Sequence, residues 1–420
     1  MNKAVITSYA RTPLSSQNGK EFIRTSIPEL AVAPFIAAVE RSRLGKSDVD
    51  GVVMGQMSSG TGEATNLARH VALKAGLDFG TACGYTVNRV CGSGFTAVIN
   101  NMMEMWVGEG NVYIAAGCEM NSHRLVSLPL SFLWTGIPRG GVTLGGWDYD
   151  GDPCTPVEVF GPIPSMGFTA DKAARIYGVT REDSDVFAYD SQMKAKKAQD
   201  SGRFDAEIIP IEVKIADKKG RISTLTYDKD LHLKPNSTLE VMRTLPAVFD
   251  EHGIVTAGSA SGSVDGAAAI VLMTEDEATR RELQPIAYLN AFAYAGVDPT
   301  IMGVGPAPAI MKLLKKTGLT IDQIDVVEIN EAFAAQVLAC MKILSSELGT
   351  DCYIGSPFYK KLNINGGAVA IGHPEGCTGV RLTMTVAEEL RRTGKRYGIC
   401  SACIGGGMGV AILLENAQLS

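Results

Sequence analysis

The chain lacks any apolar run of about 18 residues, the minimum that suggests a membrane-spanning helix. Its first residues, 1–7, pass straight into a strand pattern without the apolar segment of a signal peptide. No strongly basic patch is visible and the formal net charge is −6, which argues against nucleic acid as a partner. We therefore expect a cytoplasmic protein that binds neither a membrane nor nucleic acid.

The cysteines also lack a recognisable framework. There are nine, an odd number at scattered positions, so reduced thiols are a simpler interpretation than disulfides. Cys400 and Cys403 form a CxxC sequence, but no second pair of ligands with matching spacing lies nearby to complete a zinc site. A redox CxxC usually opens a helix, whereas glycines and an apolar run follow here. We expect neither a metal nor a redox role for this pair.

What is present is the composition of an ordinary globular protein, with 420 residues, 45% hydrophobic and 20% charged, enough for two or three domains. Two pairs of segments look duplicated. The helix-then-strand pattern of 28–54 recurs at 306–329, and the small-residue turn and strand of 257–273 recur at 401–414. Two similar α/β halves explain this order, although generic α/β patterning remains the alternative.

Between the two halves the composition and the periodicity of the sequence change. Residues 134–168 are rich in Gly, Pro and Trp, helical patterns follow at 169–177 and 181–200, and 212–233 is polar and strand-like. Functional loops sit on rigid scaffolds, so we interpret this span as an inserted loop domain. The predicted organisation is an N-terminal half, 1–118 with 253–274, a loop domain, 119–252, and a C-terminal half, 275–420.

Cys91 stands in the sequence Asn88-Arg89-Val90-Cys91-Gly92-Ser93-Gly94, between a strand-like run over 85–90 and a helical pattern that begins at Phe95. A thiol at a helix N-terminus ionises more easily, because converging N–H groups and the helix dipole favour an anion. For Cys91 alone, a buried structural cysteine is an equally good interpretation, because free cysteine is among the most buried residue types.

Three later segments carry further polar residues beside predicted strands or helices. Asn330-Glu331-Ala332-Phe333 follows the strand 326–329, Gly372-His373-Pro374 precedes a helical run, and Cys403 begins the segment Cys-Ile-Gly-Gly-Gly-Met-Gly. Sites of α/β proteins form at such ends of the sheet.

Together, in this order and over nearly the whole chain, the four segments resemble the thiolase family, of the acetyl-CoA acyltransferase kind. The resemblance implies an α/β fold of five layers, αβαβα, with two similar halves and a loop domain that contacts coenzyme A. It also implies a homodimer or homotetramer, sometimes with a small accessory acyl-CoA-binding subunit, with coenzyme A as a substrate and neither a metal nor a prosthetic group.

The chemistry of the implied reaction explains why cysteine and histidine are needed at these positions. Cleavage of a 3-oxoacyl-CoA needs a nucleophile that accepts the acyl group, and the thiol of Cys91 suits this role. By resemblance, His373 takes the Cys91 proton. Cys403 fits the acid/base that exchanges a proton with the acetyl-CoA enolate, and the glycines after it leave room for the thioester. The same site serves fatty or aromatic acid degradation and the reverse Claisen condensation.

The resemblance also assigns residues that hold the substrate. His373 and a water on Asn330 would form one oxyanion hole, and the backbone N–H groups of Cys91 and Gly405 the other. Less specific patterns assign further substrate or coenzyme A contacts to Ser261, Lys234, Met166, Phe333 and Met302. Lys218, Lys219 and Arg221 are other candidates for phosphate. Each of these has an ordinary structural alternative: a turn serine, a solvated charge or a core side chain.

The sequence departs from the family pattern near the substrate. Ser165 stands where relatives often have His, and Glu375 stands after Gly-His-Pro where an apolar residue is usual. Ser259 and Val264 stand where Asn is usual. We therefore expect an unusual acyl substrate that is bulky, aromatic or polar, unless Glu375 merely points to water or caps its helix.

Three rival functions use the same residues differently. A non-catalytic thiolase-fold subunit that binds acyl-CoA or a partner protein would need none of the four reactive positions. A ketoacyl synthase-like enzyme or a cysteine hydrolase would have no use for Cys403.

Overall fold

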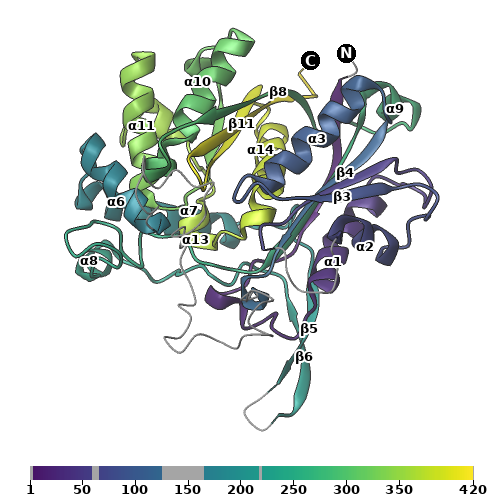
Figure 1. Ribbon diagram of the computed structural model, residues 1–420, viewed down its shortest axis with the longest axis horizontal. Helices are drawn as coiled ribbons and strands as arrows, with labels where there is room; N and C mark the ends of the chain where they lie inside the picture. The colour runs from purple at the N-terminus through teal and green to yellow at the C-terminus, as the bar shows by residue number, and fades with distance from the viewer. Residues whose placement is uncertain (1–2, 59–65, 125–164, 217–219, 420) are drawn as a thin grey trace, which may run out of the picture.

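The computed structural model describes residues 3–58, 66–124, 165–216 and 220–419 (Figure 1). Within these residues nine strands form one mixed sheet in the order β3-β2-β4-β7-β1-β8-β11-β10-β9. The strands, in chain order, are β1 (Ala4–Arg11), β2 (Gly51–Gly55), β3 (Cys83–Val87), β4 (Val112–Glu119), β7 (Gly266–Thr274), β8 (Ala287–Gly296), β9 (Val326–Ile329), β10 (Tyr397–Ile404) and β11 (Met408–Asn416).

The sheet contains the predicted duplication. The run β2-β4-β7-β1 has the same pattern as the run β9-β10-β11-β8, because in each the first two strands pair parallel and the next pairings are antiparallel. Strands β1 and β8 pair antiparallel, with Ala4 opposite Leu289, and this pairing joins the two halves into one sheet. The two similar halves predicted from the sequence are therefore confirmed, and generic patterning does not account for the matched topology.

The two halves of the sheet, β3-β2-β4-β7-β1 and β8-β11-β10-β9, act as two β layers, and three groups of helices bring the number of layers to five (Figure 1). Helices α1 (Ile27–Arg41) and α2 (Leu67–Lys74) pack on the outer face of the first half, and α10 (Pro306–Thr317) and α11 (Ala334–Leu348) cover the outer face of the second. Helices α3 (Ser93–Val107) and α14 (Glu375–Thr393) fill the space between the halves. Three apolar clusters occupy the interfaces between these layers, as the αβαβα prediction requires.

The central helices α3 and α14 touch through their backbones. A Cβ atom on Gly379 would lie 2.0 Å from the backbone N of Phe95, and one on Gly94 would lie 2.9 Å from the carbonyl oxygen of Gly376. Only glycine allows two helices to approach this closely. The contact fixes the N-termini of the two helices side by side, and Cys91 and His373 stand just before those N-termini.

The described part of residues 119–252 shares its core with the second half. Helices α6 (Met166–Tyr177) and α7 (Arg181–Asp200) pack against α11. The predicted helix over 181–200 is confirmed, and Thr180 caps it by accepting a hydrogen bond from the backbone N–H of Asp183. The boundaries of a separate loop domain stay a prediction, and 134–164 lies outside the described residues.

Short elements complete the chain. The antiparallel pair β5 (Ile211–Ala216) and β6 (Ile222–Tyr227) projects from the body of the protein as a hairpin (Figure 1). The remaining short helices are α8 (Leu239–Thr244), α9 (Glu275–Arg280), α12 (Pro357–Lys361) and α13 (Ala368–Ile371). None of the helices in the described ranges is long and apolar enough to cross a membrane.

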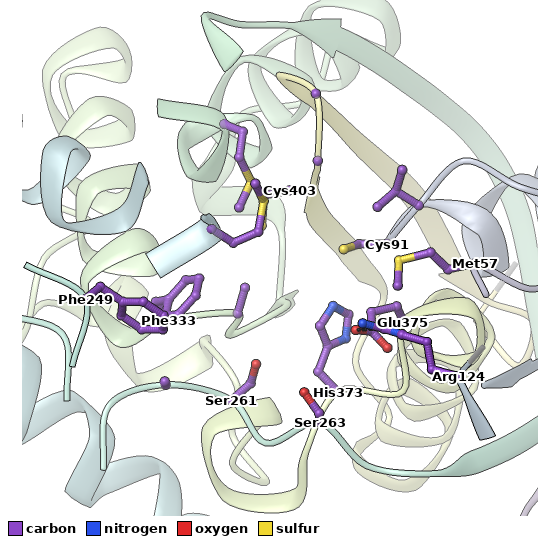
Figure 2. A pocket seen from close by; sticks show the side chains of 17 residues that line it. Met57, Cys91, Arg124, Phe249, Ser261, Ser263, Phe333, His373, Glu375 and Cys403 are labelled. Atoms are coloured by element: carbon purple, nitrogen blue, oxygen red, sulfur yellow. Dashed lines mark hydrogen bonds and ion pairs between the residues drawn. The ribbon is translucent and has the colours of Figure 1, made fainter. Parts of the chain in front are cut away.

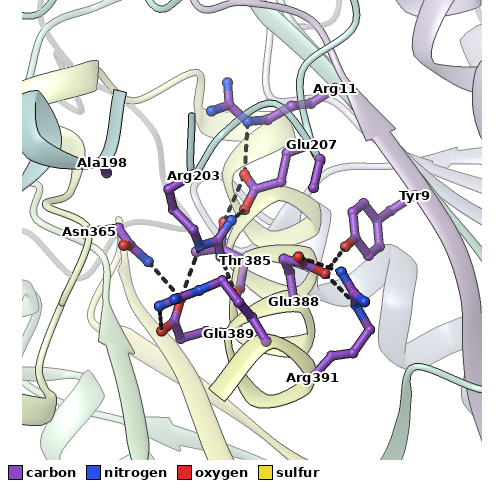
Figure 3. Close-up of polar contacts among 12 residues, drawn as sticks. Tyr9, Arg11, Ala198, Arg203, Glu207, Asn365, Thr385, Glu388, Glu389 and Arg391 are labelled. Carbon is purple, nitrogen blue, oxygen red and sulfur yellow. Dashed lines mark hydrogen bonds and ion pairs between the residues drawn. The ribbon is translucent and has the colours of Figure 1, made fainter. Parts of the chain in front are cut away.

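A buried charge network ties the inserted span to both halves (Figure 3). Arg11, at the end of β1, donates two hydrogen bonds to the carboxylate of Asp230, at 2.7 and 2.9 Å, and one to Glu207 at 3.1 Å. Arg203 joins Glu207, at 3.0 Å, to Glu389 of α14, at 2.9 Å. Because removing one partner of a buried ion pair leaves an uncompensated charge, the network fixes α14 relative to β1 and the inserted span.

Candidate active site

A cavity of about 410 Å³ opens where the two central helices begin, and both halves contribute to its walls (Figure 2). It brings together eight of the ten residues that the sequence assigns to catalysis or substrate binding. These eight are Cys91, Met166, Ser261, Met302, Phe333, His373, Cys403 and Gly405. The other wall residues are Met57, Val90, Arg124, Phe249, Ala260, Ser263, Ala332, Glu375 and Gly406.

Cys91 lies in a tight turn between β3 and α3. The predicted strand over 85–90 was wrong at its end, because β3 stops at Val87 and a turn follows. The side chain of Asn88 accepts from the N–H of Val90 at 2.9 Å, and Ser93 Oγ accepts from the N–H of Arg89 at 2.8 Å. Val90 has a φ of 49°, and a β-branched residue in this left-handed region is strained. These contacts hold the thiol of Cys91 in the cavity.

The environment of Cys91 differs from the sequence expectation of an easily ionised thiol. Burial raises its pKa well above the usual value, and the neighbouring Cys403 and Glu375 raise it further. A hydrogen bond from the backbone of Gly405 lowers it, but does not reverse the shift. Desolvation therefore raises the pKa of Cys91 by more than the helix terminus lowers it, and the thiol keeps its proton until a base removes it.

His373 is placed beside Cys91 by the glycine that precedes it. Gly372 has a φ of 94°, and a Cβ at this position would lie 2.5 Å from the side chain of Val264. The backbone N–H of His373 donates to the carbonyl oxygen of Gly262 at 2.9 Å. Burial, with a smaller effect of Arg381, lowers the pKa of His373 to about 3. The imidazole is therefore neutral near pH 7 and free to accept a proton.

Two neighbours orient the imidazole of His373. Its Nδ1 lies 2.7 Å from Thr378 Oγ1, and that hydroxyl donates its own proton to the carbonyl oxygen of Pro374 at 3.0 Å. This network assigns the ring proton to Nδ1 and the lone pair to Nε2. Asn330 Nδ2 lies 3.4 Å from Nε2, and Asn330 Oδ1 is buried without a hydrogen-bond partner in the described part of the chain. Asn330 does not line the cavity, but it stands directly behind His373.

Cys403 lies across the cavity from Cys91 on strand β10 (Figure 2). It is 1% exposed, and burial raises its pKa to about 12. The turn that follows, from Gly405 to Gly407, leads into β11. Cys400 packs into the central apolar cluster while Cys403 packs into the cluster on the other face of the sheet. The two thiols of the CxxC sequence therefore point in opposite directions and cannot share a metal or form a disulfide.

The substrate-binding candidates fall into two groups. Phe333 packs edge-on against Phe249, with ring centroids 5.9 Å apart, and the N–H of Ser261 donates to the neighbouring carbonyl of Ala332 at 3.0 Å. These residues form one wall of the cavity, together with Met166 and Met302. Lys234 lies outside the cavity, and its exposed side chain stays a candidate for a more distant part of the substrate. Arg221 directly precedes strand β6, and Lys218 and Lys219 lie outside the described residues.

The opposite wall is partly polar. Glu375 is the first residue of α14, and its side chain is 14% exposed, so it does not simply point to water. One carboxylate oxygen lies 3.3 Å from Arg124 Nη2, and the other accepts from Asn121 Nδ2 at 3.0 Å. Sequence reasoning missed Met57, Arg124, Phe249 and Ser263, because no local motif marks them and only the tertiary fold brings them to the cavity.

The described residues contain no group of three or more His, Cys, Asp or Glu side chains that could hold a metal ion. The chemistry that the cavity offers comes from two protonated thiols, one neutral imidazole and converging backbone N–H groups. This arrangement suits acyl transfer between thiols, because the nucleophile, its base and a second acid/base stand around one space.

Comparisons with known proteins agree with this geometry. The model of the thiolase N-terminal domain matches residues 4–276, and the model of the thiolase C-terminal domain matches residues 283–416. An acetyl-CoA acetyltransferase of Rhizobium meliloti (strain 1021) is 43% identical over 417 residues, which cover 98% of each chain. The crystal structure of human mitochondrial 3-ketoacyl-CoA thiolase covers 99% of each chain, with 37% identity and a TM-score of 0.85. A structure of the same human enzyme in complex with CoA has 35% identity and a TM-score of 0.83, and covers 99% of this chain and 98% of that chain.

Proposed function

The chain belongs to the thiolase family, and from this premise we propose that it is an acyltransferase that cleaves a 3-oxoacyl-CoA with coenzyme A, or runs the reverse condensation, through an acyl-Cys91 intermediate. The observation that carries the proposal is the cavity that Cys91, His373 and Cys403 share. Coenzyme A is a substrate in this reaction, and the chemistry requires no further cofactor.

In the first half-reaction, His373 Nε2 takes the proton of Cys91, and the sulfur attacks the 3-oxo carbon of the substrate. The C2–C3 bond then breaks, which leaves the acyl group on Cys91 and an acetyl-CoA enolate. Cys403 donates the proton that this enolate needs. Its raised pKa suits this role, because Cys403 stays protonated until a strongly basic carbon appears beside it.

Between the half-reactions, the proton that His373 took from Cys91 passes to the Cys403 thiolate, which restores the neutral imidazole and the Cys403 thiol. In the second half-reaction, the thiol of coenzyme A gives its proton to His373 and attacks the acyl-Cys91 thioester, and His373 passes this proton to the Cys91 sulfur as it leaves. The products are the shortened acyl-CoA and free Cys91. Negative charge on the thioester oxygen is held in one step by backbone N–H groups at Cys91 and Gly405, and in the other by His373 with Asn330. The unpaired Oδ1 of Asn330 supports this role, because a water can bridge it to the substrate. Losing one such donor typically costs ~10²–10³ in rate.

The test is covalent labelling of Cys91. Incubation with acetyl-CoA should add one acetyl mass per chain to the wild type and none to Cys91→Ala. Peptide mapping locates the label, and Cys377→Ala is the matched control because Cys377 is buried outside the cavity wall. Label on Cys403 or Cys377 in the wild type would overturn the assignment.

Cys403 also separates this proposal from its rivals. A ketoacyl synthase-like enzyme or a cysteine hydrolase does not need a second thiol in the cavity, and a non-catalytic subunit needs no reactive group there. The presence of both thiols beside a neutral imidazole favours the thiolase reaction.

The two walls of the cavity would bind different parts of the substrate. We assign the pantetheine arm of coenzyme A to the wall of Ser261, Phe249 and Phe333, because a serine hydroxyl beside aromatic rings suits its amide groups and its alkyl carbons. The acyl tail then lies against Met57, Arg124 and Glu375. Phe333 and Met302 would therefore contact the pantetheine end of the substrate. An acyl substrate that is bulky, aromatic or polar remains our proposal, because a carboxylate and a guanidinium form part of this wall.

The assembly is proposed on similar grounds. Strand β3 is an edge of the sheet, and exposed apolar side chains lie on it and on the neighbouring α3, among them Tyr85, Met103 and Val107. Such an edge favours pairing with a second copy of the chain, which would give a homodimer or, with a further contact, a homotetramer. Measurement of the molecular mass in solution tests this.

A cytoplasmic location and an accessory acyl-CoA-binding subunit are further proposals, tested by fractionation and by co-purification.

A further inference from the structure

The two walls of the cavity differ in character. Figure 2 shows Phe249 and Phe333 on one side of Cys91 and His373, and Arg124, Glu375 and Met57 on the other. Both sides lie within contact distance of the same cavity, but only the second side contains charged residues. The reacting carbon must sit beside Cys91, so a substrate that passes through the cavity places one part on each side.

Glu375 is held in the cavity wall by specific contacts. It begins α14, where the helix terminus favours a carboxylate, and it accepts a hydrogen bond from Asn121 and forms an ion pair with Arg124. Asn121 Nδ2 also donates to the carbonyl oxygen of Val264 at 3.0 Å, which fixes its position. Glu375 is therefore set against the substrate space rather than free to turn into solvent.

A carboxylate at this place works against the reaction. Glu375 raises the pKa of Cys91, and it would also oppose the negative charge that develops on the substrate oxygen. An apolar side chain would carry no such cost and would pack equally well against an alkyl tail. A substrate that forms hydrogen bonds with the carboxylate and its guanidinium partner would offset this cost.

The charge balance narrows the chemistry of that substrate. Glu119 is fully buried behind Glu375 and accepts hydrogen bonds from the backbone N–H groups of Met57 and Gly376, both at 2.9 Å. Burial and the neighbouring Glu375 raise the pKa of Glu119, and Arg124 is the cation paired with Glu375. A carboxylate on the substrate would add a negative charge beside Glu375, whereas an uncharged group can donate to Glu375 and accept from Arg124. Arg124 is half-exposed and, among the residues that the structure describes, its ion pair occupies one nitrogen, which leaves other donors for a ligand.

We propose that Glu375 and Arg124 form a specificity site for a 3-oxoacyl-CoA whose acyl tail carries an uncharged hydrogen-bonding group, such as a hydroxyl. The inference rests on the proposed thiolase reaction and adds the substrate class to it. A hydroxyl satisfies both partners at once, since it is a donor and an acceptor. A plain alkyl tail displaces the water from their remaining hydrogen-bonding positions and offers no hydrogen bond in return, and a site of this kind rejects such an analogue.

The first experiment compares four substrates of equal carbon number in coenzyme A-dependent cleavage, with acetyl-CoA formation as the readout. They are 3-oxohexanoyl-CoA, the same compound with a hydroxyl on carbon 5 or carbon 6, and 3-oxoadipyl-CoA, which ends in a carboxylate. For the wild type we expect a kcat/KM about 10- to 100-fold higher for one of the hydroxylated compounds than for the alkyl compound, and higher than for the dicarboxylic one.

The second experiment assigns that preference to the pair. Glu375→Leu should abolish the preference by lowering kcat/KM for the hydroxylated substrate and raising it for the alkyl substrate. Glu375→Gln keeps a hydrogen-bonding group without charge, so it should retain most of the preference and accept 3-oxoadipyl-CoA better. Glu182→Gln is the matched control, because Glu182 also lies in the first turn of a helix and pairs with an arginine, Arg243, outside the cavity wall.

The results test the specificity site separately from the thiolase reaction. Equal kcat/KM values for the alkyl and hydroxylated substrates, a preference for the dicarboxylic substrate, or an unchanged ratio in both Glu375 variants would overturn the specificity site while leaving the thiolase reaction intact. No acetyl label on Cys91 and no cleavage of any of the substrates would overturn both. Loss of the preference in Glu375→Leu, with retention in Glu375→Gln and Glu182→Gln, would support the specificity site.

Discussion

The hydrogen bond between Thr378 and His373 offers a sharp test of the mechanism. Thr378 is fully buried in the first turn of α14, and its hydroxyl is the group that fixes the ring proton on Nδ1. Thr378→Val keeps the shape of the side chain and removes the hydroxyl. The ring would then carry either an unpaired buried N–H at Nδ1 or its proton at Nε2, where it blocks transfer from Cys91.

The magnitude follows from the burial of both partners. Leaving a buried donor unsatisfied costs ~1–3 kcal/mol. Each ~1.36 kcal/mol lost in the transition state is a factor of ten in rate, so acylation of Cys91 should slow by roughly 5- to 150-fold. The assay is the rate at which acetyl-CoA labels Cys91, measured by rapid quenching and mass spectrometry on folded protein.

A conservative variant distinguishes orientation from structure. Thr378→Ser keeps the hydroxyl and should acylate close to the wild-type rate, even if the lost methyl group lowers stability. The free energy of unfolding of both variants is measured in parallel. If Thr378→Val labels Cys91 at the wild-type rate, the hydroxyl does not set the tautomer of His373 and our assignment of the base is wrong.

Three further outcomes are expected. Cys403→Ala should still accept an acetyl group at Cys91 but lose deuterium exchange at the α-carbon of acetyl-CoA; exchange at the wild-type rate would exclude Cys403 as the second acid/base. Because the pKa of His373 is lowered to about 3, this base stays neutral as the pH falls through 6.5. The acylation rate should therefore be nearly flat down to about pH 5, where a histidine of ordinary pKa would cost about thirtyfold. Gly379→Ala should lower the free energy of unfolding by about 1–3 kcal/mol or more, because its Cβ would lie 2.0 Å from the backbone N of Phe95. Denaturant unfolding measures this, and an unchanged midpoint would contradict the close helix contact.

The sequence by itself was enough to propose the reactive groups. Cys91, Asn330, His373 and Cys403 each stand in a short segment where glycine, a strand end or a helix start marks a site, and such signals are local. The helix over 181–200 was predictable for the same reason, because its cap and its apolar spacing lie within one stretch of chain. The duplication was also visible, since each half repeats the order of its elements along the chain.

Tertiary structure decided the properties that depend on distant neighbours. Arg124 and Glu375 are 251 positions apart in the chain, and no local pattern indicates that they meet at one cavity wall. The raised pKa of Cys91 and the lowered pKa of His373 both arise first from burial, which the packing of the whole molecule sets. Residue type and spacing determine which chemistry is available, whereas desolvation and the pairing of remote side chains depend on how the layers close around the site.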